Sequence, residues 1–135
     1  MSRYSEKQKR LGKHKKKEMV IPSGCARIYA GANNIIVSIT NNNGDVLRQV
    51  SSGSLGFKGS RKGTPHAGSE VGKRIAADVV EMFSLKTVTV YIKGPGSAKE
   101  NAIRGLVQGG LIVVALCDIT PYAHNGCRLR KAKRC

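Results

Sequence analysis

The alternation of apolar and polar residues in the first half of the chain predicts a small antiparallel sheet. In residues 35–40 every second side chain forms one apolar row, which is the period of a β-strand. Residues 26–30 and 46–50 are two further strand candidates. Gly31–Asn34 and Asn41–Asp45 hold turn-forming residues, and the second contains the Asn-Gly pair typical of hairpins. Three strands joined by two tight turns form an antiparallel meander.

The middle of the chain changes to a helical period. Thr64 and Pro65 have the residue types of an N-cap and a first helical position. Apolar residues then recur at spacings of three and four, which predicts one buried helix face, up to about Phe83, made of Val71, Ile75, Val79 and Met82.

A second helix and two more strands follow. Residues 87–92 alternate as a strand, and Ser97 with Glu100 has the spacing of a capping box. The next helix should bury Ile103, Leu106 and Val107 and end at Gly109-Gly110. The unbroken apolar run Leu111–Cys117 predicts a central strand covered on both faces, parallel to its predecessor. The predicted fold class is α/β, with a single mixed β-sheet in the order β-β-β-α-β-α-β and helices packed against it.

Charge divides the chain into three parts. The 135 residues carry a formal net charge of +16, and no apolar run approaches the length of a membrane span. Residues 1–17 hold eight basic side chains and one acid, and residues 128–135 hold five basic side chains and no acid. We therefore expect a basic N-terminal arm (1–22), one mixed α/β domain (23–118) and a basic tail (119–135). Two polycationic ends on a small domain indicate a nucleic-acid partner.

The arms have two other possible interpretations. They could be solvated, disordered tails that serve solubility alone. A membrane surface is disfavoured because residues 1–17 offer only Met1, Tyr4 and Leu11 as apolar anchors. The N-terminus lacks the apolar region of a secretory signal, so we expect the protein to work where it is made and to form no disulfides.

Residues 51–63 predict a glycine-rich basic loop. Its glycines allow a ligand to approach the backbone, Ser60 and Thr64 can donate hydrogen bonds to phosphate, and Lys58, Arg61 and Lys62 supply charge. The spacing is not that of a Walker phosphate loop. A flexible surface loop without a ligand is the alternative.

Evidence for catalysis or a cofactor is weak. Gly94-Pro95-Gly96 lies between a strand and a helix, with Asp118 about twenty residues on, as in a dinucleotide-binding turn. Lys99 occupies the third glycine position, and the chain is too short for two nucleotide-binding halves. A phosphate at that helix N-terminus is the simpler interpretation, and a turn with no ligand is the alternative. Zinc could in principle bind Cys117, His124, Cys127 and Cys135, but their spacing fits no standard zinc site. We expect no enzyme activity, no cofactor, no metal and no small-molecule substrate, with Cys25 and Cys117 buried as small apolar residues.

Several motifs together resemble one family. The segment from Asp118 to Arg128, with its Thr120-Pro121 and His124-Asn125-Gly126-Cys127 sequences, resembles the end of the domain in the bacterial type of small-subunit ribosomal protein eleven. Residues 32–40, 56–65 and 93–96 extend the resemblance in the same order. It implies a ribonuclease-H-like fold without an acidic active site. It also implies a place on the platform of the small subunit near the mRNA exit, bridging rRNA helices beside proteins seven and eighteen. Ala98-Lys99, Ala123, Leu129-Arg130 and Cys135 depart from the family pattern, which suggests a mitochondrial or plastid ribosome rather than a bacterial one.

The favoured function is therefore structural binding of small-subunit rRNA. A nucleotide- or phosphate-binding enzyme and a general RNA chaperone acting through its arms are the alternatives. In addition, Asn125-Gly126 is a chemically easy site for deamidation. The predicted RNA-binding residues are Lys13, Lys15, Lys16, Lys17, Asn33, Asn34, Phe57, Lys58, Gly59, Ser60, Arg61, Lys62, Thr64, Lys93, Lys99, Arg104, His124, Asn125, Gly126, Arg128, Arg130, Lys131, Lys133 and Arg134.

Overall fold

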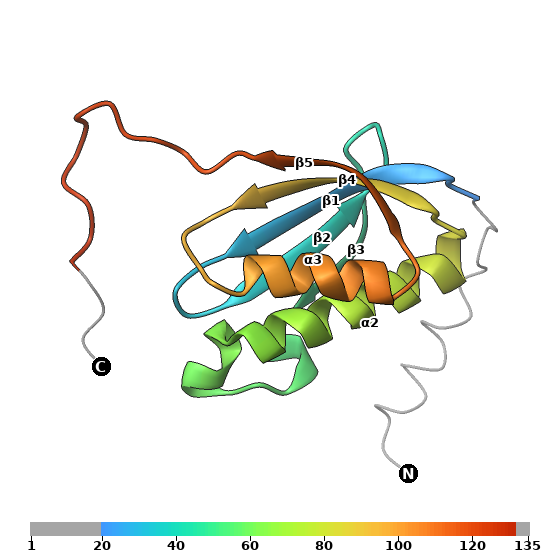
Figure 1. Cartoon of the computed structure of the whole chain (residues 1–135), viewed down its shortest axis with the longest axis horizontal. Coiled ribbons are helices and arrows are strands. Elements are labelled where there is room, and N and C mark those ends of the chain that lie inside the picture. The colour runs from blue at the N-terminus through green and yellow to red at the C-terminus, as the bar shows by residue number, and fades with distance from the viewer. Residues whose placement is uncertain (1–19, 132–135) are drawn as a thin grey trace, which may run out of the picture.

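The computed structural model describes residues 20–131, which form one five-stranded sheet with two helices on one side and a C-terminal tail that extends away (Figure 1). The spatial order of the strands is β3-β2-β1-β4-β5. The strands are β1 (Ser23–Ala30), β2 (Ile35–Thr40), β3 (Val46–Ser51), β4 (Thr87–Lys93) and β5 (Ile112–Asp118). The helices are the short 3-10 turns η1 (Gly53–Leu55) and η2 (Gly59–Gly63) and the α-helices α2 (Pro65–Phe83) and α3 (Lys99–Gln108). The predicted single mixed sheet is confirmed.

The first three strands form the antiparallel half of the sheet, as the alternation predicts. Strand β2 pairs antiparallel with both β1 and β3. The β2–β3 turn is held by the side chain of Asn41, whose Oδ1 accepts hydrogen bonds from the backbone N–H of Asn43 and of Asp45. Gly44 adopts a φ of 96°, which glycine reaches without strain. The Asn-Gly turn prediction is therefore confirmed.

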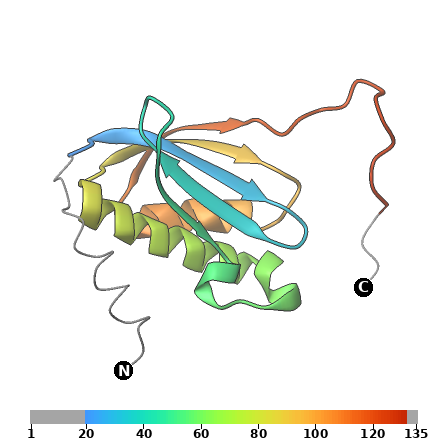
Figure 2. The same cartoon turned by 180° about the vertical axis from the view of Figure 1, so that it is seen from behind.

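Both helices lie against the same face of the sheet (Figures 1 and 2). The hydrophobic core lies between the helices and the sheet. It consists of alternate residues of β1, β2 and β4 and of one side of each helix. Its largest fully buried side chains include Ile28, Ile35, Val37, Ile75, Val90 and Leu106. The period of two in the strands and of 3.6 in the helices brings these apolar rows together.

Strand β5 corrects the prediction of a central strand. It pairs parallel with β4, as predicted, but it lies at the edge of the sheet. Ile112, Val114 and Leu116 are 62%, 67% and 58% exposed. A register shift between Val88 and Thr89 of β4 also interrupts the pairing with β5. Seven apolar residues in a row reveal hydrophobicity, but not whether neighbours exist to cover it.

The cysteines also differ from expectation. Cys117, in the edge strand, is exposed, and Cys25 is partly buried rather than enclosed in the core. Both lie on the side of the sheet away from the helices, because they alternate with residues of the helix-covered face. The prediction that they are buried is wrong for Cys117.

The two helices pack backbone to backbone through glycines. A Cβ on Gly72 would lie 2.4 Å from the carbonyl oxygen of Ala102, and one on Gly105 would lie 2.5 Å from that of Ser69. Helix α3 consequently buries Ala102, Gly105 and Leu106. The predicted stripe is wrong at Val107, which is 53% exposed, because small residues rather than large apolar ones form this contact.

The helix ends follow the sequence only in part. Thr64 caps α2 and Pro65 begins it, as predicted, and the helix ends at Phe83. The predicted burial of Met82 is wrong, since its side chain is 41% exposed. The capping box of the second helix is also absent: the N-cap is Ala98, which makes no side-chain hydrogen bond to the helix.

Candidate nucleic-acid interface

Three connecting segments meet at one end of the sheet, here called the turn end: residues 31–34, residues 52–64 and residues 94–98. Glycines allow the contact. A Cβ on Gly63 would lie 2.6 Å from the carbonyl oxygen of Ala32, and one on Gly96 would lie 2.7 Å from that of Ala30. The N–H of Gly96 also donates to the oxygen of Ala30 at 2.8 Å. The chain after β5 leaves from the same end (Figure 1). Basic residues that are distant in sequence therefore share one rigid surface.

The start of the basic loop is fixed to the β1–β2 turn through Asn34. Its Oδ1 accepts hydrogen bonds from the buried hydroxyl of Ser52 and, at 2.9 Å, from the backbone N–H of Ile35. The N–H of Ser52 donates to the oxygen of Ile35 at 3.1 Å. Asn34, which the sequence proposes as an RNA ligand, thus uses its side-chain oxygen to position the loop. Asn33 beside it is exposed.

The other end of the loop is fixed by Thr64. Its hydroxyl donates to the carbonyl oxygen of Arg61 at 2.8 Å and accepts from the N–H of Ala67 at 3.4 Å. The bond from Ala67 satisfies an orphan N–H group in the first turn of α2. The hydroxyl predicted to bind phosphate is therefore engaged in capping the helix, and its contribution to a ligand site is to orient Arg61.

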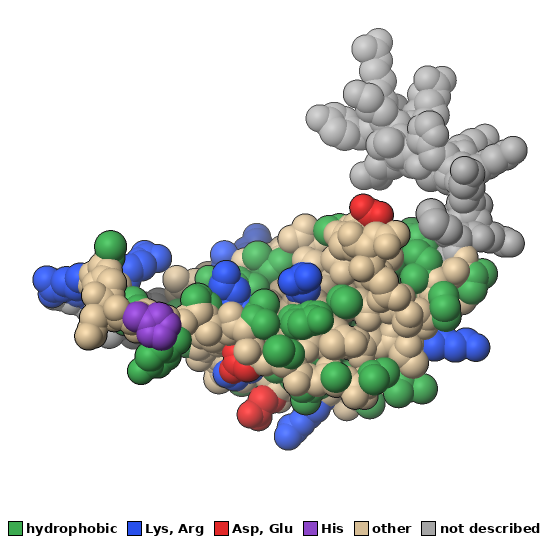
Figure 3. Space-filling model, turned by 90° about the horizontal axis from the view of Figure 1, so that it is seen from above, with side chains coloured by type: hydrophobic (Ala, Val, Ile, Leu, Met, Phe, Trp, Pro, Cys, Tyr) green, Lys and Arg blue, Asp and Glu red, His purple; other side chains and the backbone are tan. Residues whose placement is uncertain are grey.

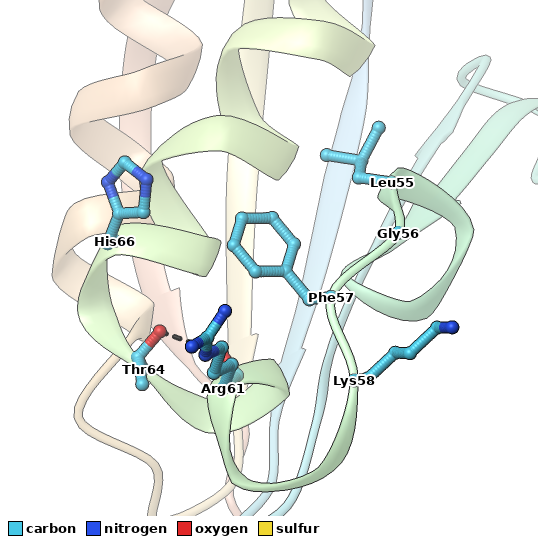
Figure 4. Close-up of a pocket in the computed structure, with 7 residues that line it drawn as sticks. All are labelled: Leu55, Gly56, Phe57, Lys58, Arg61, Thr64 and His66. Carbon is cyan, nitrogen blue, oxygen red and sulfur yellow. Dashed lines mark hydrogen bonds between the residues drawn. The ribbon is translucent and has the colours of Figure 1, made fainter.

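Between these two anchors lies a hollow of about 710 Å³, lined by Leu55, Gly56, Phe57, Lys58, Arg61, Thr64 and His66 (Figure 4). Figure 4 shows the Phe57 ring between Leu55 and His66, with Arg61 beside it. The rings of Phe57 and His66 meet edge to face, with centroids 6.0 Å apart and planes at 77°. An aromatic wall next to two exposed cations can hold a base and its phosphate together.

The backbone of this loop is shaped by two glycines that face open space. Gly56 and Gly59 have φ values of 92° and 59°, and no heavy atom lies within 4 Å of where a Cβ would stand. Lys62 is half-buried, with its stem near Gly53, whereas Lys58, Ser60 and Arg61 are exposed. The predicted cations thus differ in role, since Lys62 partly packs on the loop.

Sequence reasoning missed a second set of residues beside this hollow. A further depression of about 470 Å³ shares Leu55, Phe57 and His66 and continues to Glu70, Lys73 and Arg74 on α2. Lys73 lies 3.7 Å from Glu70, and Arg74 lies 3.5 Å from Asp78, which Arg48 also contacts at 3.1 Å. The helical spacing could have indicated these residues, because it places Lys73 two turns after His66 on the same face of α2.

A clasp at the root of the tail joins β5 to the β4–α3 turn. Asp118 Oδ1 accepts from the hydroxyl of Thr120 at 2.6 Å and from its N–H at 2.9 Å, and the Thr120 hydroxyl accepts from the N–H of Gly94 at 3.2 Å. The side-chain and backbone hydrogen bonds from Thr120, with help from the charge of Lys99, lower the pKa of Asp118. This clasp sets the direction in which the tail leaves the domain.

The remaining predicted residues are spread more widely. Lys93 is exposed at the end of β4 and Lys99 is half-buried at the start of α3, both at the turn end, whereas Arg104 is exposed farther along α3. The tail residues His124, Asn125, Gly126, Arg128, Arg130 and Lys131 are all exposed and extend away from the domain (Figure 1). Lys13, Lys15, Lys16, Lys17, Lys133 and Arg134 lie outside the described residues.

Within residues 20–131, no helix is both long and apolar enough to cross a membrane. No group of three or more His, Cys, Asp or Glu side chains is arranged to hold a metal ion in that part of the chain.

Comparison with known protein families places the chain in one family. The family model of ribosomal protein S11 matches residues 24–134, which span the sheet, both helices, the basic loop and the tail. The chain belongs to the ribosomal protein S11 family. S11 proteins are structural, non-enzymatic constituents of the small ribosomal subunit, where they bind rRNA and other small-subunit proteins. The turn end and the tail are thus the candidate rRNA-binding surfaces of an S11 protein.

Proposed function

We propose that this S11 protein binds rRNA on the platform of the small subunit, near the mRNA exit, and bridges rRNA helices there. The observation that carries the proposal is the convergence of the basic loop, the β1–β2 turn and the root of the tail at one end of the sheet. A rigid end and a basic tail can bind different RNA segments at once, which is what bridging requires.

The proposal assigns a part to each region of the chain. Residues 23–118 supply a shaped rRNA-binding domain, and residues 1–22 and 119–135 supply arms that neutralise phosphates. The domain is related to ribonuclease H, an inference supported by an antiparallel half-sheet followed by two parallel strands. Its neighbours are the small-subunit proteins of the seven and eighteen families. The departures from the bacterial pattern favour a mitochondrial or plastid ribosome.

Sedimentation tests the ribosomal assignment. A native lysate is separated on a sucrose gradient, probed for this chain, and the separation is repeated at high salt. We expect co-migration with small subunits that survives moderate salt. Migration as a small free protein would overturn the proposal and return the nucleotide-binding and chaperone readings.

Salt-dependent RNA binding tests the interface. Binding of the purified chain to small-subunit rRNA should weaken steeply with salt, and each lost phosphate contact should reduce the log–log slope by about 0.7–0.9. The variant Lys58→Ala/Arg61→Ala should therefore lose up to two such increments. The matched control is Lys86→Ala, because Lys86 is exposed at the opposite end of β4. Equal slopes for all three proteins would remove the basic loop from the interface.

A further inference from the structure

One face of the sheet is left uncovered by the helices. Figures 1 and 2 show both helices below the sheet, so the view from above in Figure 3 looks onto the opposite face, here called the open face. Basic side chains lie among hydrophobic ones near its centre, and acidic side chains lie toward its edges (Figure 3). The residues that matter are Arg27, Tyr29, Ile36, Ser38, Tyr91 and Lys93, which line a shallow hollow of about 260 Å³.

The register of β1 and β4 places two tyrosines and two cations next to one another on the open face. On the paired strands β1 and β4, Arg27 lies opposite Tyr91 and Tyr29 lies opposite Lys93. The Arg27 guanidinium stands over the Tyr91 ring, 5.1 Å from its centroid. This cation–π contact holds a flat, charged group on the sheet surface. Flat guanidinium and aromatic surfaces are the groups on which proteins stack unpaired bases.

Tyr29 supplies an accessible ring at the border of the turn end. Its side chain is 48% exposed. The ring lies close to Gly31, since a Cβ on that glycine would be 3.4 Å from Cε1 and 3.5 Å from the hydroxyl oxygen of Tyr29.

The open-face hollow is smaller than the roughly 300–1,000 Å³ of small-molecule pockets. It therefore suits a flat group that is held from one side.

The charge of the open face favours a polyanion. Neither Arg27 nor Lys93 makes an ion pair within residues 20–131. No acidic residue occupies an open-face position of the strand register in the same part of the chain, because Asp118 pairs with Ile92 and so falls on the alternate side. An apolar protein surface placed here would bury two cations without counter-charges, which is costly. A phosphate backbone supplies those counter-charges.

We propose that the open face is a stacking platform for one or two unpaired bases of a single-stranded RNA segment. Tyr29 and the Arg27–Tyr91 pair stack the bases, and Lys93 contacts a neighbouring phosphate. The proposal rests on the proposed RNA-binding function but uses a surface separate from the basic loop. Stacking of this kind tolerates any base, because every base offers a flat face.

The test measures binding of the full-length chain to a fluorescent oligoadenylate and to an abasic strand of equal length and charge. Loss of one stacked base weakens binding about 5- to 150-fold. Tyr29→Leu should show that loss with oligoadenylate but no change with the abasic strand, whereas Tyr29→Phe should bind both like the wild type. The chain has four tyrosines and no tryptophan, so quenching of tyrosine emission by bound oligoadenylate is a second readout.

The outcomes separate this proposal from the function on which it rests. If Tyr29→Leu and Tyr91→Leu bind oligoadenylate like the wild type while Lys58→Ala/Arg61→Ala binds rRNA more weakly, the platform is refuted and the rRNA-binding function stands. If the leucine variants lose affinity equally for the abasic strand, base stacking is refuted. If the wild-type chain binds neither rRNA nor oligonucleotide, the proposed function itself fails. Circular dichroism of each variant checks that the fold is retained.

Discussion

The glycine contact between α2 and α3 makes a quantitative prediction for Gly72→Ala. The new Cβ would lie 2.4 Å from the oxygen of Ala102 and 3.0 Å from Cα of Gly105, where ordinary contacts begin at 3.4 Å. The helices must therefore separate by about 1 Å, and a gap of that size forfeits a quarter to a half of each affected dispersion contact. Both obstacles are backbone atoms, so no side chain can rotate away.

The expected magnitude follows from two opposed terms. Overpacking costs about 1–3 kcal/mol, and the upper end applies because the obstacles are backbone atoms. Replacing glycine by alanine inside a helix stabilises the folded state by about 1 kcal/mol, because alanine loses less backbone entropy on folding. The net loss in the free energy of unfolding should be about 2 kcal/mol, a large share of the roughly 5–15 kcal/mol that stabilises a typical domain.

Urea unfolding of the full-length chain, followed by circular dichroism, measures this loss. The control is Gly53→Ala, whose new Cβ would meet nothing closer than Lys62 Cδ at 3.8 Å and should change stability by less than about 0.5 kcal/mol. Gly72→Ala/Gly105→Ala should cost less than the sum of the single variants, because one separation relieves both overlaps. A Gly72→Ala protein as stable as the wild type, or more stable, would refute the close-packed interface.

Three further predictions concern single sites. Leu106→Ala should lower the free energy of unfolding by about 2–5 kcal/mol and the exposed Leu116→Ala by less than about 1 kcal/mol, as measured by urea unfolding. Thr120→Ala should raise the pKa of Asp118 in a carboxyl NMR titration, because it removes the side-chain hydrogen bond that lowers this pKa. In the wild type, the hydrogen bonds to the ionised carboxylate stabilise the fold at neutral pH. This contribution is lost as the pH falls through the depressed folded-state pKa. Peptide mapping of aged protein should find isoaspartate at Asn125, which is exposed with a φ of 54°, before it appears at the Asn-Gly pair of the β2–β3 turn, whose glycine N–H is hydrogen-bonded.

The sequence predicts best where a local rule and the tertiary environment agree. The alternation in β2 and the cap at Thr64 are local signals, and both appear in the structure. The burial of β5 depends on which elements cover it, and nothing in the apolar run 111–117 records that. The buried side of α3 is set by Gly105 and its close contact with α2, which a search for large apolar residues overlooks.

The candidate site shows the same division. Charge predicts Lys58, Arg61 and Lys62 as the cations of one basic loop, and the structure places the exposed Lys58 and Arg61 in one hollow but leaves Lys62 half-buried outside its lining. Polar side chains are harder to assign, because Asn34 and Thr64 can serve either a ligand or the backbone and here serve the backbone. His66 was missed since its partner, Phe57, lies nine residues earlier and meets it only after the loop folds back.

The clasp between Asp118, Thr120 and Gly94 has a consequence for avidity. It fixes the origin of the tail beside the turn end, so the tail acts as a tethered ligand rather than a free peptide. Ten residues from Asp118 to Arg128 reach at most about 35 Å, which confines the tail's cations to RNA near the docked domain. In the proposed complex with rRNA, tail binding is intramolecular and proceeds at an effective concentration in about the millimolar range. Loosening the clasp would lower that effective concentration while leaving unchanged every residue proposed to contact RNA.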